Sequence, residues 1–198
     1  MIKKIVLASS NAGKVREFNE LLQGSGIEVV PQTLYGVPDI EETGLSFVEN
    51  AILKARNAAQ HTGLPAIADD SGLEVDALDG APGIYSARYA GDGASDEDNL
   101  LKLLDALKDT PDAERGARFQ CLMVHLRHGA DPTPRIVQGT WEGAILHTPR
   151  GDNGFGYDPV FYVPEQDCSS AQLAPGIKNR LSHRGQALRR LITLLRDA

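Results

Sequence analysis

Two pairs of adjacent acidic residues are the first candidates for chemistry in this sequence. Glu41-Glu42 precedes a predicted helix, and Asp69-Asp70 follows the apolar pair Ile67-Ala68. Carboxylates on short loops at the edge of a sheet suit Mg²⁺, a hard ion that takes oxygen ligands and keeps several waters. Because neighbouring side chains on a strand point to opposite faces, we expect only one of Asp69 and Asp70 to face a ligand. The alternative for Glu41-Glu42 is an ordinary solvated loop.

A candidate anion site is the segment Ser9-Ser-Asn-Ala-Gly-Lys14, which follows a predicted strand and opens a predicted helix. Backbone N–H groups at such a helix start favour an anion, and Lys14 adds positive charge. The segment is not a Walker A loop, because Ala8 and Val15 replace the glycine and hydroxyl residue that this motif requires. The alternative is an ordinary turn with a surface lysine.

Two further segments combine residue types that suit a nucleotide. Gly154-Phe-Gly-Tyr-Asp-Pro159 pairs aromatic residues with glycines, so that a base could stack and approach the backbone closely. The segment 178–185 places several hydrogen-bond donors at the start of a predicted helix. Arg184 in the first turn of that helix opposes the helix dipole unless an anion or an acceptor lies nearby. The alternatives are a loop packed into the core and a solvated basic helix end.

Composition restricts the class of protein. Hydrophobic residues make up 41% and charged residues 24% of the 198 residues, which is typical of a soluble globular protein. The net charge of −7 argues against a nucleic-acid-binding surface. The sequence has no apolar stretch long enough to span a membrane and no signal peptide. We therefore expect a cytoplasmic protein whose two cysteines are reduced thiols.

The elements that must position these residues alternate along the chain. The predicted order is strand 5–8, a helix ended by Gly24, strand 27–30, a helix between Ser46 and Gly63, and a short strand 66–68 that ends before Asp69. A helix capped by Ser95, strands 119–126 and 136–145, and a helix 182–196 follow. The alternation predicts a single α/β domain over residues 1–198, with a mixed, twisted sheet flanked by helices.

In this order, the segments resemble the inosine triphosphate pyrophosphatase family, also called the XTP/dITP diphosphatases. The resemblance runs from Ile5 to Leu195. Its most specific part is the block Ala68–Tyr89, and the other parts are Ser9–Lys14, Glu42–Ala55, Gly154–Pro159 and Ser182–Gly185. One departure is Tyr157, at a position where some members carry tryptophan.

The resemblance implies an elongated, two-lobed fold, a substrate cleft between the lobes and a homodimer. It also implies hydrolysis of purine nucleoside triphosphates such as ITP, dITP and XTP to the monophosphate and pyrophosphate, with Mg²⁺ as cofactor. Asp70 would be the general base and a Mg²⁺ ligand, and Glu42 would help to hold the metal. Residues implied to bind the triphosphate are Ser9, Ser10, Asn11, Ala12, Gly13, Lys14, Lys54 and Ser71, with Arg88 as a further phosphate contact. Residues implied to bind the base and sugar are Phe155, Gly156, Tyr157, Asp158, Lys178, His183 and Arg184.

Three other functions remain open at this point. A septum-type nucleotide pyrophosphatase would share the reaction but differ in the base pocket. A nucleotide-binding sensor would bind without turnover. A phosphatase with Asp69 or Asp70 as nucleophile would release orthophosphate through an aspartyl-phosphate, so its product would distinguish it.

Overall fold

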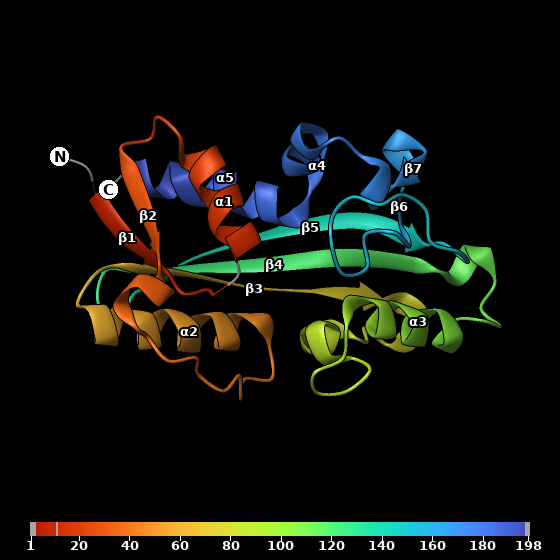
Figure 1. Cartoon of the computed structure of the whole chain (residues 1–198), viewed down its shortest axis with the longest axis horizontal. Coiled ribbons are helices and arrows are strands. Elements are labelled where there is room, and N and C mark those ends of the chain that lie inside the picture. Colours follow the sequence, from red (N-terminus) through yellow and green to blue (C-terminus); the bar gives the residue numbers. More distant parts are fainter. Residues whose placement is uncertain (1–2, 11, 197–198) are drawn as a thin grey trace. The chain divides into compact units, whose positions relative to one another are not determined.

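The computed structural model describes residues 3–10 and 12–196 (Figure 1). Helices and strands alternate over the first half of the chain, and short strands precede two final helices. In chain order the elements are β1 (Lys3–Leu7), α1 (Ala12–Leu22), β2 (Ile27–Pro31), α2 (Phe47–Thr62), β3 (Ala66–Val75), α3 (Asp96–Ala106), β4 (Gly116–Leu126), β5 (Arg135–Ile145), β6 (Phe161–Val163), β7 (Cys168–Ser169), α4 (Pro175–Leu181) and α5 (His183–Arg196).

The strands form one seven-stranded sheet in the order β2-β1-β3-β4-β5-β6-β7. Strand β1 pairs in parallel with β2 and β3, whereas β6 pairs antiparallel with β5 and β7. The predicted α/β fold with a mixed, twisted sheet flanked by helices is therefore confirmed. None of the helices in the described ranges combines the length and the hydrophobicity needed to cross a lipid bilayer.

The chain divides into two compact units. Unit 1 comprises residues 1–70, 121–139 and 184–198, and unit 2 comprises residues 71–120 and 140–183. Strands β3, β4 and β5 contribute residues to both units. The expectation of a single catalytic domain over residues 1–198 remains a prediction.

In unit 1, alternating side chains of β1 and β3 pack on two different groups of helices. Ile5, Leu7 and Ile67 belong to a buried cluster that includes residues of α1 and α5. The residues between them, such as Val6 and Ala66, belong to a second cluster with the alanines of α2. Figure 1 shows α2 on one side of these strands and α1 and α5 on the other. The two-residue period of a strand therefore decides which helices each side chain meets.

Unit 2 has an aromatic core of its own. The Phe119 ring lies 4.6 Å from the Phe161 ring and 6.4 Å from the Trp141 ring, measured between centroids. Buried leucines of α3 complete the cluster. The buried Arg115 guanidinium donates hydrogen bonds to the carbonyl oxygens of Leu107 and Ile145, which ties the end of α3 to the end of β5.

The limits of β3 differ from the prediction. The short strand expected over 66–68 continues to Val75, so Asp69 and Asp70 lie inside a ten-residue strand rather than after it. Aspartate is unfavourable in strands because strand positions are half-buried, and propensity yields to specific contacts. Here, cationic side chains pair with both carboxylates and offset the cost of burying them. The short elements β6, β7 and α4 were not predicted either.

Candidate functional site

The alternation of β3 separates the two aspartates. Asp69 follows Ile67 by two residues and lies on the face of the strand that meets α1 and α5. Asp70 follows Ala68 by two residues and lies on the face that meets α2. Two adjacent carboxylates therefore meet different partners, and each must be considered by itself.

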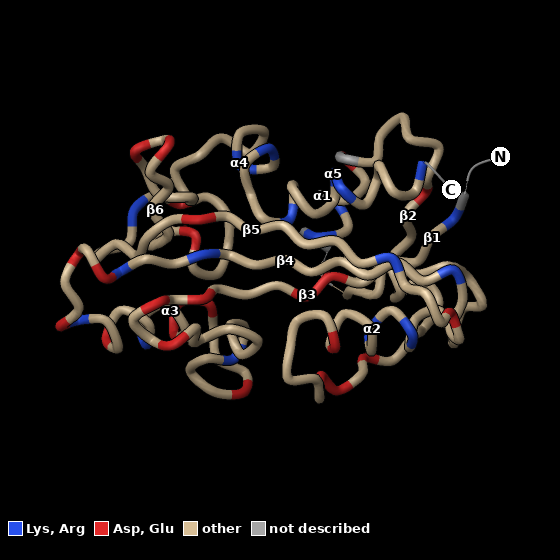
Figure 2. Tube along the Cα trace, turned by 180° about the vertical axis from the view of Figure 1, so that it is seen from behind, with Lys and Arg blue, Asp and Glu red and all other residues tan. Residues whose placement is uncertain are grey.

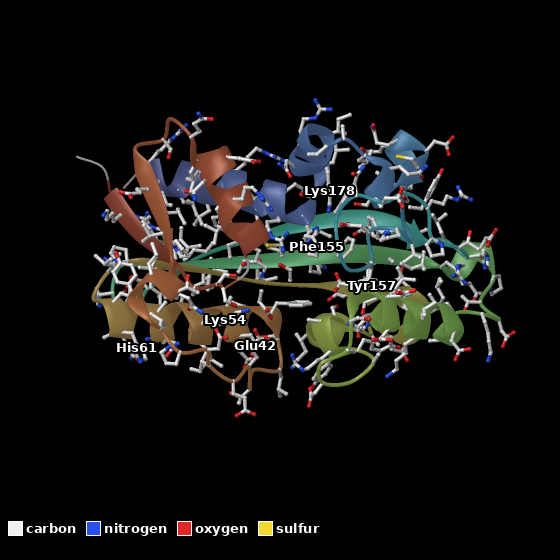
Figure 3. The ribbon with its side chains drawn as sticks, viewed as in Figure 1. Glu42, Lys54, His61, Phe155, Tyr157 and Lys178 are labelled. Carbon is white, nitrogen blue, oxygen red and sulfur yellow. The ribbon has the colours of Figure 1, made fainter. Side chains whose placement is uncertain are left out.

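Asp70 lies in a cluster of three charged side chains, together with Lys54 of α2 and Glu42. Lys54 Nζ donates hydrogen bonds to Asp70 Oδ1 at 2.7 Å and to Glu42 Oε1 at 2.9 Å. Figure 3 shows Glu42 and Lys54 close together on the α2 side of unit 1. Burial raises the pKa of Asp70, although the charge of Lys54 acts in the opposite direction. Burial also acts to lower the pKa of Lys54, but the charge of Asp70 raises it overall.

The donor set of this cluster fits Mg²⁺. Asp70 Oδ2 is buried and has no hydrogen-bond partner among the described residues. Glu42 and Asp70 both contact the same ammonium group, so they bring oxygen ligands of the preferred kind to one place. Within the described ranges, no group of three or more His, Cys, Asp or Glu side chains could hold a metal ion. Two carboxylates suffice for Mg²⁺ when substrate phosphate and water complete the shell.

The segment that carries Glu42 is fixed to the start of α2. Ser46 caps the helix by accepting a hydrogen bond from Glu49 N, while Glu49 accepts from Ser46 Oγ and Leu45 N. Asn50 is fully buried, and its Oδ1 accepts a hydrogen bond from Gly44 N at 2.8 Å. A side chain on Gly44 would collide with Asn50, because its Cβ would lie 2.7 Å from that oxygen. The predicted start of the helix at Ser46 is confirmed, but Glu49 bonds to Ser46 Oγ and Leu45 N rather than to the backbone N–H of Ser46 that a capping box requires. The role of Asn50 was not foreseen.

Asp69 is the buried counter-ion of two cations from two different helices. Lys14 Nζ of α1 lies 3.1 Å from Asp69 Oδ1 and 3.0 Å from Oδ2. Arg184 Nε of α5 lies 3.4 Å from Oδ2. Burial alone would raise the pKa of Asp69, but the charges of Lys14 and Arg184 hold it far below its usual value. Asp69 also supplies the anion that the position of Arg184 in the first turn of α5 requires.

The anion segment after β1 joins that strand to α1. Ser9 N donates to Leu7 O at 2.8 Å, Ser9 is half-buried, and Ser10 is exposed. Asn11 lies outside the described residues. Ala12 and Gly13 begin α1, which places Lys14 in its first turn. Ser71 follows Asp70 in β3 and is half-buried.

In unit 2, the segment 154–158 is organised around the buried Asp158 carboxylate. Its Oδ2 accepts hydrogen bonds from Phe155 N at 2.9 Å and from Lys178 Nζ at 2.5 Å, and its Oδ1 accepts from Ser170 Oγ at 2.8 Å. Gly154 has a φ of 85°, and a Cβ there would collide with Asp158 Oδ2. The segment therefore requires glycine at this position both for its backbone conformation and for space.

The two aromatic side chains of this segment have different environments. The Phe155 side chain is exposed, with a relative accessibility of 55%, and Lys178 Nζ lies 5.2 Å from the centroid of its ring. Figure 3 shows Phe155, Tyr157 and Lys178 in unit 2. Tyr157 is buried, and its hydroxyl donates to Ser86 O at 2.8 Å. The Phe155 ring is thus exposed beside Lys178, whereas Tyr157 anchors the segment.

The remaining predicted residues also have defined partners. His183 begins α5 and stacks on Phe119, with ring centroids 4.8 Å apart. The Arg88 guanidinium lies 5.2 Å from the Tyr85 ring centroid, at the end of the 3₁₀ segment Gly83–Arg88. Gly156 N donates to Asp96 Oδ2 at the start of α3.

A pocket of about 320 Å³ in unit 2 lies between the start of α3 and the segment 149–159. Leucines of α3 and the residues Gly154, Phe155 and Gly156 line it, together with the acidic residues Asp96, Glu97 and Asp152. The acidic residues on α3 are visible in Figure 2. The negative charge disfavours binding of phosphate in this pocket.

Comparisons with known proteins cover almost the whole chain. The model of the Ham1 family matches residues 5–194. A dITP/XTP pyrophosphatase of Vibrio cholerae is 61% identical over 99% of this chain and 98% of its own length. A dITP/XTP pyrophosphatase of Thioalkalivibrio sulfidiphilus is 63% identical over 97% of this chain and 98% of its own length. The solved structure of a HAM1 protein from Coxiella burnetii is 54% identical, with a TM-score of 0.94 over 99% of this chain and 100% of that one. The resemblance that the sequence motifs indicated is confirmed.

Proposed function

This chain belongs to the Ham1 family, and we propose that it is a Mg²⁺-dependent pyrophosphatase for non-canonical purine nucleoside triphosphates, with dITP, ITP and XTP as substrates. The names of its relatives, which match over nearly their full lengths, support this substrate class. The observation that carries the mechanism is the buried Asp70 carboxylate, which has one oxygen on Lys54 and the other without a hydrogen-bond partner among the described residues. In the proposed reaction, water attacks the α-phosphorus, the bond to the β-phosphate oxygen breaks, and pyrophosphate leaves.

Asp70 is the proposed general base. Its raised pKa makes it a stronger base than an exposed aspartate, and burial is the main cause of this shift. Lys54 holds Oδ1 in place, so Oδ2 is left to face both the metal site and the water that it deprotonates. Mg²⁺ held by Asp70 and Glu42 would neutralise charge on the phosphate oxygens.

Positive groups of unit 1 are the proposed triphosphate site. Attack on the α-phosphorus increases the negative charge on the phosphate oxygens and the departing pyrophosphate. Lys14, Lys54 and the backbone N–H groups at the start of α1 can stabilise this charge. Both lysines are already fixed by carboxylates, so they need little reorganisation when the substrate binds.

Base selection is assigned to donors and an aromatic ring. Hypoxanthine and xanthine carry an oxygen at C6, where adenine carries an amino group. Arg184 has only donors, so it would donate a hydrogen bond to the C6 oxygen of hypoxanthine or xanthine. Against adenine, it would face the C6 amino group, another donor, and be left unpaired. His183 and Lys178 are further donors, and Phe155 is the proposed stacking partner. Such a hydrogen-bonding site can reject the wrong base by up to about 10⁴-fold.

We further propose a homodimer that acts on the nucleotide pool of the cytoplasm. Two-fold dimers are the commonest closed assemblies of soluble proteins. Sedimentation at micromolar concentration should give twice the 21.3 kDa mass of the chain, and a species of the chain mass alone would contradict the dimer.

A substrate panel tests the reaction. The protein is incubated with Mg²⁺ and with ITP, dITP, XTP, ATP, GTP and the pyrimidine triphosphates, and both products are identified. We expect inosine or xanthosine monophosphate plus pyrophosphate, with little turnover of ATP. Orthophosphate as first product would favour the aspartyl-phosphate mechanism, binding without turnover would favour the sensor, and a preference for pyrimidines would favour the septum-type enzyme.

A further inference from the structure

We infer that Asp69 is a positioning residue that couples phosphate binding to base selection, because a single carboxylate holds both Lys14 and Arg184. This inference rests on the proposed function, which assigns Lys14 to the triphosphate and Arg184 to the base. It gives Asp69 a role different from that of its neighbour Asp70, although the two residues are adjacent and chemically identical.

Both oxygens of the Asp69 carboxylate contact these cations. Its side chain is fully buried, and both of its oxygens lie within 3.4 Å of a cationic nitrogen. Asp70 differs, since its Oδ2 has no hydrogen-bond partner among the described residues. A buried carboxylate that satisfies two cations is poorly placed to serve as a metal ligand or a base as well.

Each of the two cations carries more N–H donors than its contact with Asp69 uses. An ammonium group has three N–H donors, and the guanidinium of arginine has five. Arg184 directs its Nε at Asp69, while its two Nη groups carry the donors suited to planar recognition of a carbonyl oxygen. Asp69 thus sets the direction of each cation and neutralises part of their mutual repulsion.

The geometry connects three elements of unit 1. Lys14 lies in the first turn of α1, Asp69 in β3 and Arg184 in the first turn of α5. Loss of the carboxylate charge would leave two cations facing an uncharged group and free to move apart. Because displacement of a binding group by about 1 Å can cost about 10²-fold in rate, both functions should suffer from one substitution.

The test uses Asp69→Asn, which keeps the shape of the side chain and removes its charge. We expect kcat/KM for ITP to fall by about 10²-fold and the preference for ITP over ATP to narrow. Asp69→Glu, which keeps the charge, should retain more of the preference than Asp69→Asn. The matched control is Asp131→Asn, since Asp131 is another buried aspartate of unit 1 and pairs with Arg127. The control should lower the melting temperature without changing the preference.

Double-mutant cycles make the coupling measurable. In the Asp69→Asn background, Arg184→Ala should not change the ratio of kcat/KM for ITP and ATP any further. Lys14→Ala should lower kcat/KM for ITP by a smaller factor in that background than in the wild type. Lys14→Ala and Arg184→Ala should also combine non-additively when Asp69 is present. This second cycle tests the coupling through Asp69 even if the Asp69→Asn variant does not fold, because it leaves Asp69 unchanged. Additive effects, or an Asp69→Asn protein with wild-type kinetics, would overturn the inference alone. A wild-type protein that does not hydrolyse ITP would overturn the proposed function and this inference with it.

Discussion

The carboxylates of β3 and the segment around Asp158 show two ways of building a proposed binding site. In unit 1, a strand places Asp69 and Asp70 by its two-residue period, and helices bring Lys14, Lys54 and Arg184 to them. In unit 2, a loop folds around the Asp158 carboxylate, which accepts hydrogen bonds from a backbone N–H, a lysine and a serine. The first arrangement concentrates fixed charge, and the second presents one exposed aromatic ring. We therefore expect substitutions in unit 1 to reduce kcat strongly and those in the unit 2 segment to raise KM.

The largest expected effect is that of Asp70→Asn. The substitution keeps the hydrogen bond from Lys54 but removes the basicity of the group. We expect kcat for ITP to fall by about 10²-fold or more, the scale of general base catalysis, with an unchanged melting profile. Steady-state kinetics with ITP provide the measurement. Turnover at the wild-type rate would exclude Asp70 as the base.

Removal of the metal should have a comparable effect. Exhaustive chelation should lower the rate by more than about 10²-fold, since charge stabilisation worth several kcal/mol is lost. Glu42→Gln should raise the Mg²⁺ concentration that gives half-maximal rate. Glu41→Gln is the matched control, because Glu41 is the exposed neighbour. If the two variants respond alike to Mg²⁺, Glu42 is not a ligand.

An intermediate effect is expected at Phe155. Stacking of one base on an aromatic ring contributes about 1–3 kcal/mol, so Phe155→Ala should raise KM by roughly 10-fold or more. The change should be similar for ITP and ATP, because every purine presents a ring face. Arg184→Ala should instead narrow the difference between the two substrates. The measured quantity is the ratio of kcat/KM for ITP and ATP, and a changed ratio in Phe155→Ala would give the ring a role in selection.

A smaller effect should come from Ser170→Ala. Ser170 Oγ donates to Asp158 Oδ1, and the loss of one hydrogen bond to a charged group costs about 1.5–3 kcal/mol of stability. We expect a modest rise of KM with kcat unchanged, because Asp158 retains Lys178 and Phe155 N. A fall in kcat with unchanged KM would contradict the assignment of this segment to binding.

The same contrast explains what the sequence could predict. The helix from Ser46 to Gly63 and the separation of Asp69 from Asp70 both follow from local rules, namely caps and strand alternation. The full length of β3 was not predictable in that way. Whether an aspartate can remain inside a strand depends on Lys14 and Arg184, which are distant in sequence and carry no local signal.

Long-range contacts account for the other omissions. The sequence does not reveal that Ser170 binds Asp158 or that Ser86 receives the Tyr157 hydroxyl, because these residues are far apart in the chain and individually ordinary. Asn50 is different, since a buried polar residue on the apolar face of a predicted helix is itself a signal. The partner that satisfies it, Gly44 N, lies six residues earlier in a loop, and no local rule predicts that contact.

The smallest expected effect, on stability rather than on rate, is that of Tyr157→Phe. The variant keeps the buried ring but loses the hydrogen bond to Ser86 O, which should cost about 0.5–1.5 kcal/mol at neutral pH. Burial raises the pKa of the Tyr157 hydroxyl above its ordinary value of 10.0. In the unfolded chain this hydroxyl would ionise near pH 10, whereas in the folded protein it stays protonated to higher pH. The stabilisation that it gives is therefore complete below pH 10 and declines as the pH rises above that value.

Denaturant unfolding at pH 8 and at pH 10.5 should show a smaller loss of stability in Tyr157→Phe than in the wild type over this interval. If the difference in the free energy of unfolding between the wild type and Tyr157→Phe stays constant with pH, Tyr157 is not protected from ionisation in the folded state. A change in KM without a change in stability would instead show that the Tyr157 hydroxyl contacts the substrate.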